Sequence, residues 1–260
     1  MTKETTESPS SVPLHKSDRM RFHCDSQLSC FTKCCRDVNI FLSPYDILRL
    51  KKKLGMTSGD FLQEYTISLV PEASGFPVVL LKMEEGRNRA CPFVTPQGCS
   101  VYEDRPWSCR MFPLDQGGRA GYFNFIAPPS LCLGMHQGTE QTVERYLESQ
   151  NVALYDENEK LLGRIASNPR FLKTAIQNTK IREMIRMALY DLDQFRKFVL
   201  ESRFLHIFDV EKETSEKIAT DDLELLKFAL RWLEFGLVAG ETLKMREDLV
   251  SRGKGGANAG

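Results

Sequence analysis

Apolar residues recur at helical spacing in the second half of the chain. Between residues 221 and 246, leucines stand at positions 223, 226, 230, 233 and 237, a heptad-like stripe that predicts one long helix. Further apolar residues at 225, 228, 229, 232 and 235 widen the stripe, so we expect burial on more than one side. Such a stripe fits a packed core or a dimer face. Shorter helices are expected over 142–153, 157–166, 168–177 and 191–208.

The first half has shorter elements. An apolar series between residues 44 and 54 predicts a helix. Ser43 is its N-cap, Pro44 stands in its first turn, and Gly55 is its stop signal. Thr57 and Asp60 indicate a second, short helix through residue 65. Strands are expected at 38–42, 67–70, 78–83 and 121–126, with the middle two as a hairpin, and residues 91–113 as mostly loop. These patterns predict an α+β fold: a loop-rich part with short helices and a small sheet, then a mainly α-helical part.

We expect four regions along the chain. They are a disordered N-terminal segment, 1–20, a cysteine-cluster metal-binding domain, 21–136, a helical domain, 137–248, and a flexible tail, 249–260. The first region lacks the apolar stretch of a secretory signal, and no stretch reaches the ~20 apolar residues of a membrane span. Lys and Arg number 35 against 35 Asp and Glu, so no overall field favours nucleic acid. We therefore expect a cytoplasmic protein that binds neither nucleic acid nor membranes.

The candidate chemistry lies in eight cysteines, none of which follows residue 132. They are Cys24, Cys30, Cys34, Cys35, Cys91, Cys99, Cys109 and Cys132. Many are beside Pro, Gly or charged residues, a pattern typical of metal ligands or disulfides rather than of core packing. Disulfides are disfavoured in a reducing cytoplasm, so we expect a metal ion as the partner of these thiols. Four thiolates satisfy one zinc ion or one iron–sulfur cubane, so eight allow two sites, or one site with cysteines to spare.

The adjacent pair Cys34 and Cys35 constrains how the thiols are shared. Adjacent side chains tend to diverge, so either each serves a different nearby metal, or one is a ligand while the other packs. The sequence leaves both alternatives open. Around Cys109, Arg105 is expected to shape the turn that aims the thiol, and Arg110 to offset thiolate charge. Neither arginine is expected to be a ligand.

No catalytic motif stands out in the chain. A glycine-rich phosphate loop, an H-E-x-x-H zinc motif, a nucleophile elbow and a C-x-x-C redox pair are all missing from the sequence. We therefore assign no catalytic residue. Beyond the metal, a protein partner could bind through the C-terminal helices, and the sequence does not determine the oligomeric state.

The combined motif resembles the YkgJ-type cysteine-cluster family. The residues that carry the resemblance are F-x-C…C…CC, then S-P-x-D-I-x-R-L, then C-P-F…G-C-S-V-Y-E-x-R-P-x-x-C-R-x-F-P and a last cysteine, within residues 22–132. The resemblance implies a zinc- or iron-chelating domain. Proteins of this family are also described as containing an iron–sulfur cluster. Its matched positions are the eight cysteines, with Arg105, Pro106, Arg110 and Pro113 as their frame.

The first cysteine group departs from the family pattern. Family members commonly show C-x2-C-x2-C-C, whereas this chain has C-x5-C-x3-C-C. The longer spacing is nearer to a flagellin lysine-N-methylase branch, which implies an alternative function as an iron–sulfur-dependent protein lysine methyltransferase-like enzyme. No S-adenosylmethionine loop is recognisable. We expect a metal-binding protein, with zinc and iron–sulfur equally compatible.

Overall fold

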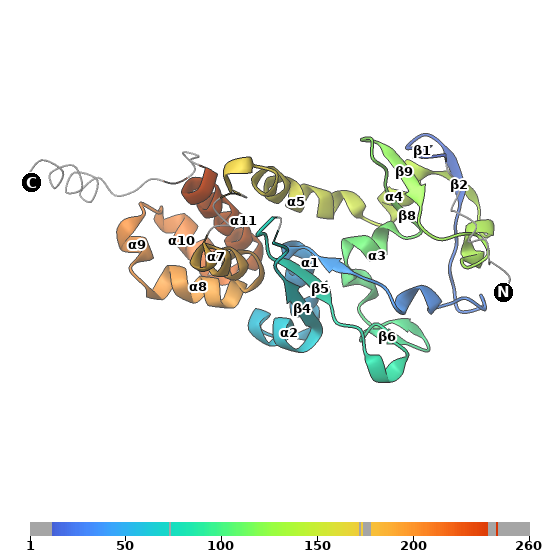
Figure 1. Ribbon diagram of the computed structural model, residues 1–260, viewed down its shortest axis with the longest axis horizontal. Coiled ribbons are helices and arrows are strands. Elements are labelled where there is room, and N and C mark those ends of the chain that lie inside the picture. The colour runs from blue at the N-terminus through green and yellow to red at the C-terminus, as the bar shows by residue number, and fades with distance from the viewer. Residues whose placement is uncertain (1–11, 73, 172, 174–177, 239–242, 244–260) are drawn as a thin grey trace, which may run out of the picture. The chain divides into compact units, whose positions relative to one another are not determined.

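The computed structural model describes residues 12–72, 74–171, 173, 178–238 and 243 (Figure 1). As predicted, the fold is α+β, with small sheets of two or three strands and mostly helices after residue 142. The chain forms two compact units, each assembled from two separate stretches. Unit 1 is Met1–Leu42 with Leu81–Glu157, and unit 2 is Ser43–Leu80 with Asn158–Gly260. The four regions expected from the sequence stay predictions.

The ends of the chain are described only in part. Residues 1–11 and the tail expected from 249 lie outside the described residues. Within the segment expected to be disordered, residues 12–20 contain the strand β1 (Leu14–His15) and most of β2 (Arg19–Arg21). No helix in the described part of the chain has the length and apolar character needed to cross a membrane.

Unit 1 contains short antiparallel strands joined by short helical turns. β1, β9 (Tyr122–Phe125) and β8 (Leu114–Gln116) form one sheet in the order β1-β9-β8. β2 pairs with β10 (Glu140–Thr142), and β6 (Val94–Thr95) pairs with β7 (Gly98–Cys99). The remaining elements are η1 (Lys33–Cys35), β3 (Phe41–Leu42), η2 (Glu85–Arg87), η3 (Tyr102–Asp104), α3 (Trp107–Met111), η4 (Leu133–His136) and α4 (Val143–Ser149).

One apolar cluster joins β2, α3, β8, β9 and α4 of unit 1. It contains Met20, Met111, Leu114, Phe123, Val143, Tyr146 and Val152. Met111 is the last residue of α3, so its burial fixes the short helix that carries Cys109. The Tyr146 hydroxyl donates to the carbonyl of Phe112, which ties α4 to the residue after α3. Part of the segment expected to be loop is therefore helical, because tertiary packing overrides its local turn signals.

Unit 2 is mainly helical. It contains α1 (Pro44–Leu54), α2 (Ser58–Tyr65), β4 (Thr66–Leu69), α7 (Thr179–Tyr190), α8 (Leu192–Glu201), α9 (Phe204–Ile207), α10 (Lys212–Thr220), α11 (Asp222–Leu233) and the π-helical turn η5 (Glu234–Val238). Two elements cross the boundaries between the units along the chain. They are β5 (Val78–Leu81), at the end of the first stretch of unit 2, and α5 (Val152–Ala166), at the start of its second stretch. β4 lies beside β5 in a small sheet, as the hairpin pattern predicts.

The predicted start and stop of α1 are confirmed. Ser43 accepts a hydrogen bond from the Asp46 backbone, and the Asp46 carboxylate accepts one from the Ser43 backbone, so a capping box opens the helix. Gly55 ends α1 with φ of 66°, the left-handed conformation that favours glycine. Thr57 caps α2 by accepting from the Asp60 backbone.

The leucine-rich helix is buried on more than one side, as expected. In α11, Leu225, Leu226, Phe228, Ala229, Leu230, Trp232 and Leu233 are all buried. Phe195 of α8 lies with its ring centroid 5.5 Å from that of Trp232, and Phe204 of α9 lies 5.8 Å from Phe228. The stripe therefore forms the core of unit 2. Its α-helix ends at Leu233, and most of the predicted continuation to residue 246 lies outside the described residues.

Two expected helices are each divided in the structure. Asn151, with φ of 54°, separates α4 from α5. Ser202 is extended and its hydroxyl accepts from the Phe204 backbone, so α8 ends there and α9 begins. The helices α7 and α10 were not predicted, and much of the helix expected over 168–177 lies outside the described residues.

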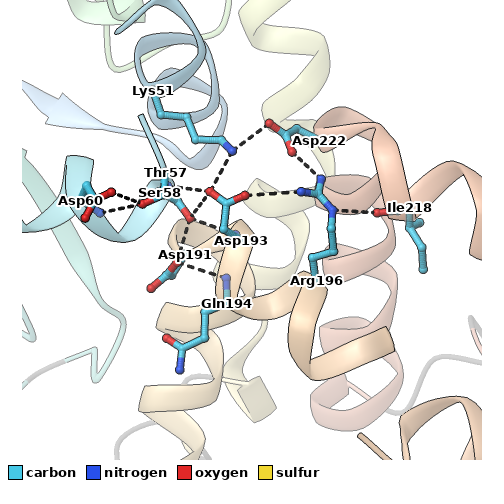
Figure 2. Close-up of polar contacts among 10 residues, drawn as sticks. All are labelled: Lys51, Thr57, Ser58, Asp60, Asp191, Asp193, Gln194, Arg196, Ile218 and Asp222. Carbon is cyan, nitrogen blue, oxygen red and sulfur yellow. Dashed lines mark hydrogen bonds and ion pairs between the residues drawn. The ribbon is translucent and has the colours of Figure 1, made fainter. Parts of the chain in front are cut away.

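A largely buried ionic network joins the helices of unit 2 (Figure 2). Lys51 of α1, 6% exposed, lies 3.0 Å from Asp193 of α8 and 2.9 Å from Asp222 of α11. Arg196 binds the same two carboxylates. The Ser58 backbone N–H, at the start of α2, donates to Asp193 over 2.6 Å. Four helices thus share one set of charges, which fixes their relative positions.

The free energy of unfolding is expected to fall in acid because of this network. Burial acts to raise the pKa of Asp193, but Ser58 and Lys51 bring it below its ordinary value. For Asp222, burial likewise opposes the lowering of the pKa by Arg196 and Lys51. A carboxylate with a depressed folded pKa stabilises the fold above its unfolded pKa, and that contribution is lost as pH falls through the folded pKa.

Urea unfolding at a series of pH values, followed by helical circular dichroism, measures this effect. A chelator is kept present so that metal release does not contribute. The urea concentration at the midpoint of unfolding should decrease as the pH is lowered from about 5 to about 2. A midpoint that stays constant over this range would contradict the prediction.

Candidate metal centre

All eight cysteines lie in described residues of unit 1, and the structure holds all of them as thiols rather than disulfides. They come from parts of the chain separated by as many as 108 positions (132 − 24). Cys24 and Cys34 are exposed, Cys132 is buried, and the other five are partly buried. Such an arrangement suits metal ligands, which need both access for the ion and partial shielding from water.

Two thiols lie beside the contact between the N-terminal stretch and η4, and two more lie in the turn that leads into η1. We define the first cysteine set as Cys24, Cys30, Cys34 and Cys132. The His23 N–H donates to the Gly134 carbonyl over 3.1 Å, which places Cys24 beside the segment that follows Cys132. The Lys33 N–H donates to the Cys30 carbonyl over 3.0 Å, so a tight turn brings Cys30 close to Cys34.

The thiols of this first set influence one another electrostatically. The Cys24 residue as a whole is exposed, yet desolvation around its sulfur raises its pKa to about 11, and Cys34, Cys132 and Cys30 add to the rise. Burial raises the pKa of Cys132, and Cys30 and Cys34 add to it. The thiols of the first set are therefore close enough to influence one another's pKa.

Three thiols are brought together around the hairpin of β6 and β7, and a fourth is linked to them electrostatically. We define the second cysteine set as Cys35, Cys91, Cys99 and Cys109. The Cys91 N–H donates to the Cys35 carbonyl over 2.8 Å, and Cys99 is opposite Val94 in the hairpin. The Val94 N–H in turn donates to the Cys91 carbonyl over 3.1 Å. The hairpin and this backbone contact therefore bring three cysteines of the set together.

Cys109 is linked to this second set through its electrostatic effect on the pKa of Cys35. The hydrogen bond with Cys34 raises the pKa of Cys35, and burial and the thiols of Cys109 and Cys91 raise it further. Burial raises the pKa of Cys91 to about 11, and Cys99 contributes to the rise. Metal binding requires thiolates, so binding at these thiols must release protons.

The two sets meet at the adjacent pair. The sulfurs of Cys34 and Cys35 are 4.0 Å apart. The hydrogen bond from Cys35 lowers the pKa of Cys34 to about 7. Within the described residues, no three His, Cys, Asp or Glu side chains converge closely enough to hold a metal ion. The thiols are thus gathered in one region without pointing at common centres.

Arg105 and Arg110 brace the helix that carries Cys109. Arg105, 7% exposed, donates to the Tyr102 carbonyl and to the Gln150 side chain, both over 2.5 Å. Arg110, 3% exposed, donates to the Arg105 carbonyl over 3.0 Å and to the Gln150 carbonyl over 2.9 Å. These acceptors are neutral oxygens, and each guanidinium also lies over an aromatic ring, Arg105 over Tyr102 and Arg110 over Tyr155. The Arg105 charge also opposes the rise that burial causes in the pKa of Cys99.

Two residues of the site have no signal in the sequence. Gln150 accepts from both arginines, although it lies about forty positions further along the chain. Gly134 allows a close approach, since a Cβ atom there would lie 2.6 Å from the His23 carbonyl oxygen. Only the folded chain shows that these residues support the cysteines.

The donor chemistry fits the metals that the motif implies. Thiolates bind zinc and the irons of iron–sulfur clusters, and four of them complete either site. The eight thiols of unit 1 supply that number twice. Buried arginines beside one set offset the negative charge that four thiolates bring.

Comparison with known proteins supports the same chemistry. Residues 23–133 match the family CxxCxxCC, which is described as a "putative zinc- or iron-chelating domain". The match includes all eight cysteines and both arginines. No curated protein and no solved structure matches the chain at a significant level. Residues 23–133 are therefore similar to a zinc- or iron-chelating cysteine-cluster domain, as the motif indicates.

Proposed function

We propose that unit 1 binds zinc or an iron–sulfur cluster through the eight cysteines, and that this bound metal organises the fold of the unit. The observation that carries the proposal is the gathering of all eight thiols in one compact unit, from positions as far apart as Cys24 and Cys132. A chain brings such distant thiols together at a cost in conformational entropy, which metal ligation offsets. Arg105 and Arg110 are proposed to position Cys109 and to balance thiolate charge.

The short elements of unit 1 support a structural contribution from the metal. Its strands contain two to four residues each, and α3 contains five. Strands of this length supply few hydrogen bonds, so small domains of this kind are commonly stabilised by metals. The methyltransferase alternative has no supporting observation in the described residues or in the comparisons. A cytoplasmic location stays a proposal that the cysteine content favours.

Metal analysis of anaerobically purified protein tests the proposed function. Mass spectrometry measures zinc and iron per chain, and a visible absorption spectrum is recorded on the same sample. Zinc without visible absorption would identify a zinc site, whereas iron with acid-labile sulfide and broad visible absorption would identify a cluster. Protein free of both metals that does not take them up on reconstitution would overturn the proposal.

A further inference from the structure

We propose that unit 1 binds a small organic anion, with a carboxylate or phosphate head group and an apolar body, in a pocket formed by β2, β10, η4 and the loop after β9. The pocket has a volume of about 330 Å³ and is lined by described residues of unit 1. This volume is at the lower end of the range for ligand sites, about 300–1,000 Å³, so it suits a small molecule. The inference goes beyond the proposed metal binding and does not depend on it.

The polar side of the pocket comes from two arginines of β2. Side chains alternate along a strand, so Arg19 and Arg21 point to one face while Met20 points to the other. Met20 is buried in the apolar cluster of unit 1, which fixes the strand and leaves both arginines exposed. Residues two apart in a strand are separated by about 7 Å, so an anionic group between the two guanidinium groups can accept hydrogen bonds from both.

The positive charge of this arginine pair exceeds the negative charge beside it. Among the described residues that line the pocket, Glu140 carries the only carboxylate, and it pairs with Arg19 over a long and exposed contact of 3.4 Å. Arg21 donates to the neutral Gly138 carbonyl over 3.3 Å, and in the described part of the chain no carboxylate lies within ion-pair distance of it. His136 of η4 adds an imidazole to the lining. This charge balance favours an anion.

Apolar side chains form the remainder of the lining. They come from the end of β9, the loop after it and η4, and they are Phe125, Ala127, Pro129 and Met135. A bare inorganic anion would leave these groups in contact with water, whereas an aromatic or aliphatic body would cover them. An organic anion therefore matches the charged and the apolar parts of the pocket together.

Backbone hydrogen bonds hold the elements of the pocket in place. β2 pairs with β10 along its whole length. The His23 N–H, just after β2, donates to the Gly134 carbonyl of η4 over 3.1 Å. The Ile126 N–H donates to the Pro113 carbonyl over 3.0 Å, which fixes the start of the loop after β9. The pocket is therefore preformed, and a ligand has little backbone to order when it binds.

Nuclear magnetic resonance of the methionine methyl groups tests the inference at the pocket itself. The full chain, with the metal it holds as purified, is isotopically labelled at these methyl groups and titrated with phenylacetate. The Met135 resonance, identified by its loss in Met135→Leu, should shift until the site is saturated. Met184, on α7 of unit 2 and 38% exposed, is the internal control and should not shift.

Related ligands separate the contributions of the charge and of the apolar body. Phenylacetamide has nearly the same size as phenylacetate but no charge, and it should bind about tenfold more weakly because it cannot form charge-assisted hydrogen bonds with the arginines. Phenyl phosphate should shift Met135 as phenylacetate does, and the tighter of the two identifies the preferred head group. Inorganic phosphate should leave the Met135 resonance unchanged.

Variants test the two parts of the pocket separately. Arg21→Gln removes one charge and should weaken phenylacetate binding by about tenfold. Arg145→Gln is the matched control, because Arg145 is an exposed arginine of α4 that does not line the pocket, and it should bind phenylacetate as the wild-type protein does. Ala127→Phe fills part of the apolar space and should abolish binding. Unchanged resonances of the other methionines show that each variant is folded.

The outcomes decide for or against the site. Saturable shifts of Met135 that require the carboxylate, Arg21 and the space beside Ala127 would establish it. An unshifted Met135 resonance with both organic anions would overturn it. Equal binding of phenylacetamide, or equal weakening by Arg21→Gln and Arg145→Gln, would overturn it as well. Metal content is measured on the same samples, so the result for the proposed metal binding is obtained separately.

Discussion

Replacing Cys34 and Cys109 together by serine is expected to abolish metal binding and the cooperative unfolding of unit 1. Cys34 lies in η1 and Cys109 in α3, so the double change removes proposed ligands from two separate stretches of unit 1. Structural zinc in small domains contributes an apparent free energy of about 10–16 kcal/mol, comparable with the whole stability of a typical domain, about 5–15 kcal/mol. Unit 1 should therefore lose its fold, whereas unit 2, which contains none of the cysteines, should keep its helices.

The two tryptophans of the chain allow each unit to be followed separately. Trp107 lies in unit 1, where its indole N–H donates to Asp156 over 2.8 Å, and Trp232 lies in the core of unit 2. In a Trp232→Phe background, fluorescence during urea unfolding reports unit 1, and in a Trp107→Phe background it reports unit 2. Exposed Ser29, beside Cys30, provides the control variant Ser29→Ala. Full metal content in the double cysteine variant would contradict the prediction.

Lys51→Met is expected to destabilise unit 2 by about 3 kcal/mol, since removing one partner of a buried ion pair leaves charge without compensation. The Lys51 ammonium lies between the carboxylates of Asp193 and Asp222, and its side chain is only 6% exposed. Without it, two partly buried negative charges face each other with Arg196 as the remaining cation of the network. The urea midpoint in the Trp107→Phe background measures the loss.

The next residue along α1 supplies the matched control. Lys52 is exposed, so Lys52→Met removes the same charge from the same helix without disturbing the network. A change within about 0.5 kcal/mol is expected for it, as for most surface substitutions. Equal destabilisation by the two variants would show that the buried network contributes nothing beyond surface charge.

Local signals predicted the elements whose determinants are local. The capping residues of α1 and α2, and the apolar stripe of α11, act within a few positions of the helices that they specify. The helix α3 was missed because its five residues lie among turn signals and depend on burial of Met111. The segment 191–208 was predicted as one continuous helix, but it is interrupted at Ser202, whose hydroxyl accepts from the Phe204 backbone. The spacing of apolar residues carries no signal for such a hydrogen bond.

The sequence predicted the ligand chemistry of the site, but it did not predict which cysteines lie close together. Thiol-rich segments, with arginines and prolines at fixed spacing, indicate metal ligation because few other roles suit so many cysteines outside a core. Which cysteines lie together depends on contacts between distant stretches, such as the hydrogen bond between Cys35 and Cys91. Spacing along the chain carries no information about such contacts.

The sequence by itself determined the α+β fold class and a cysteine cluster similar to a zinc- or iron-chelating domain, since residue type decides ligand chemistry and short-range periodicity decides helices. The tertiary structure decided that the chain folds as two units made from alternating stretches, and that the Cys35 carbonyl accepts from the Cys91 N–H. It also decided that Gln150 holds both arginines. The physical reason is that these contacts join residues far apart in the chain, and only the packed fold brings them within reach.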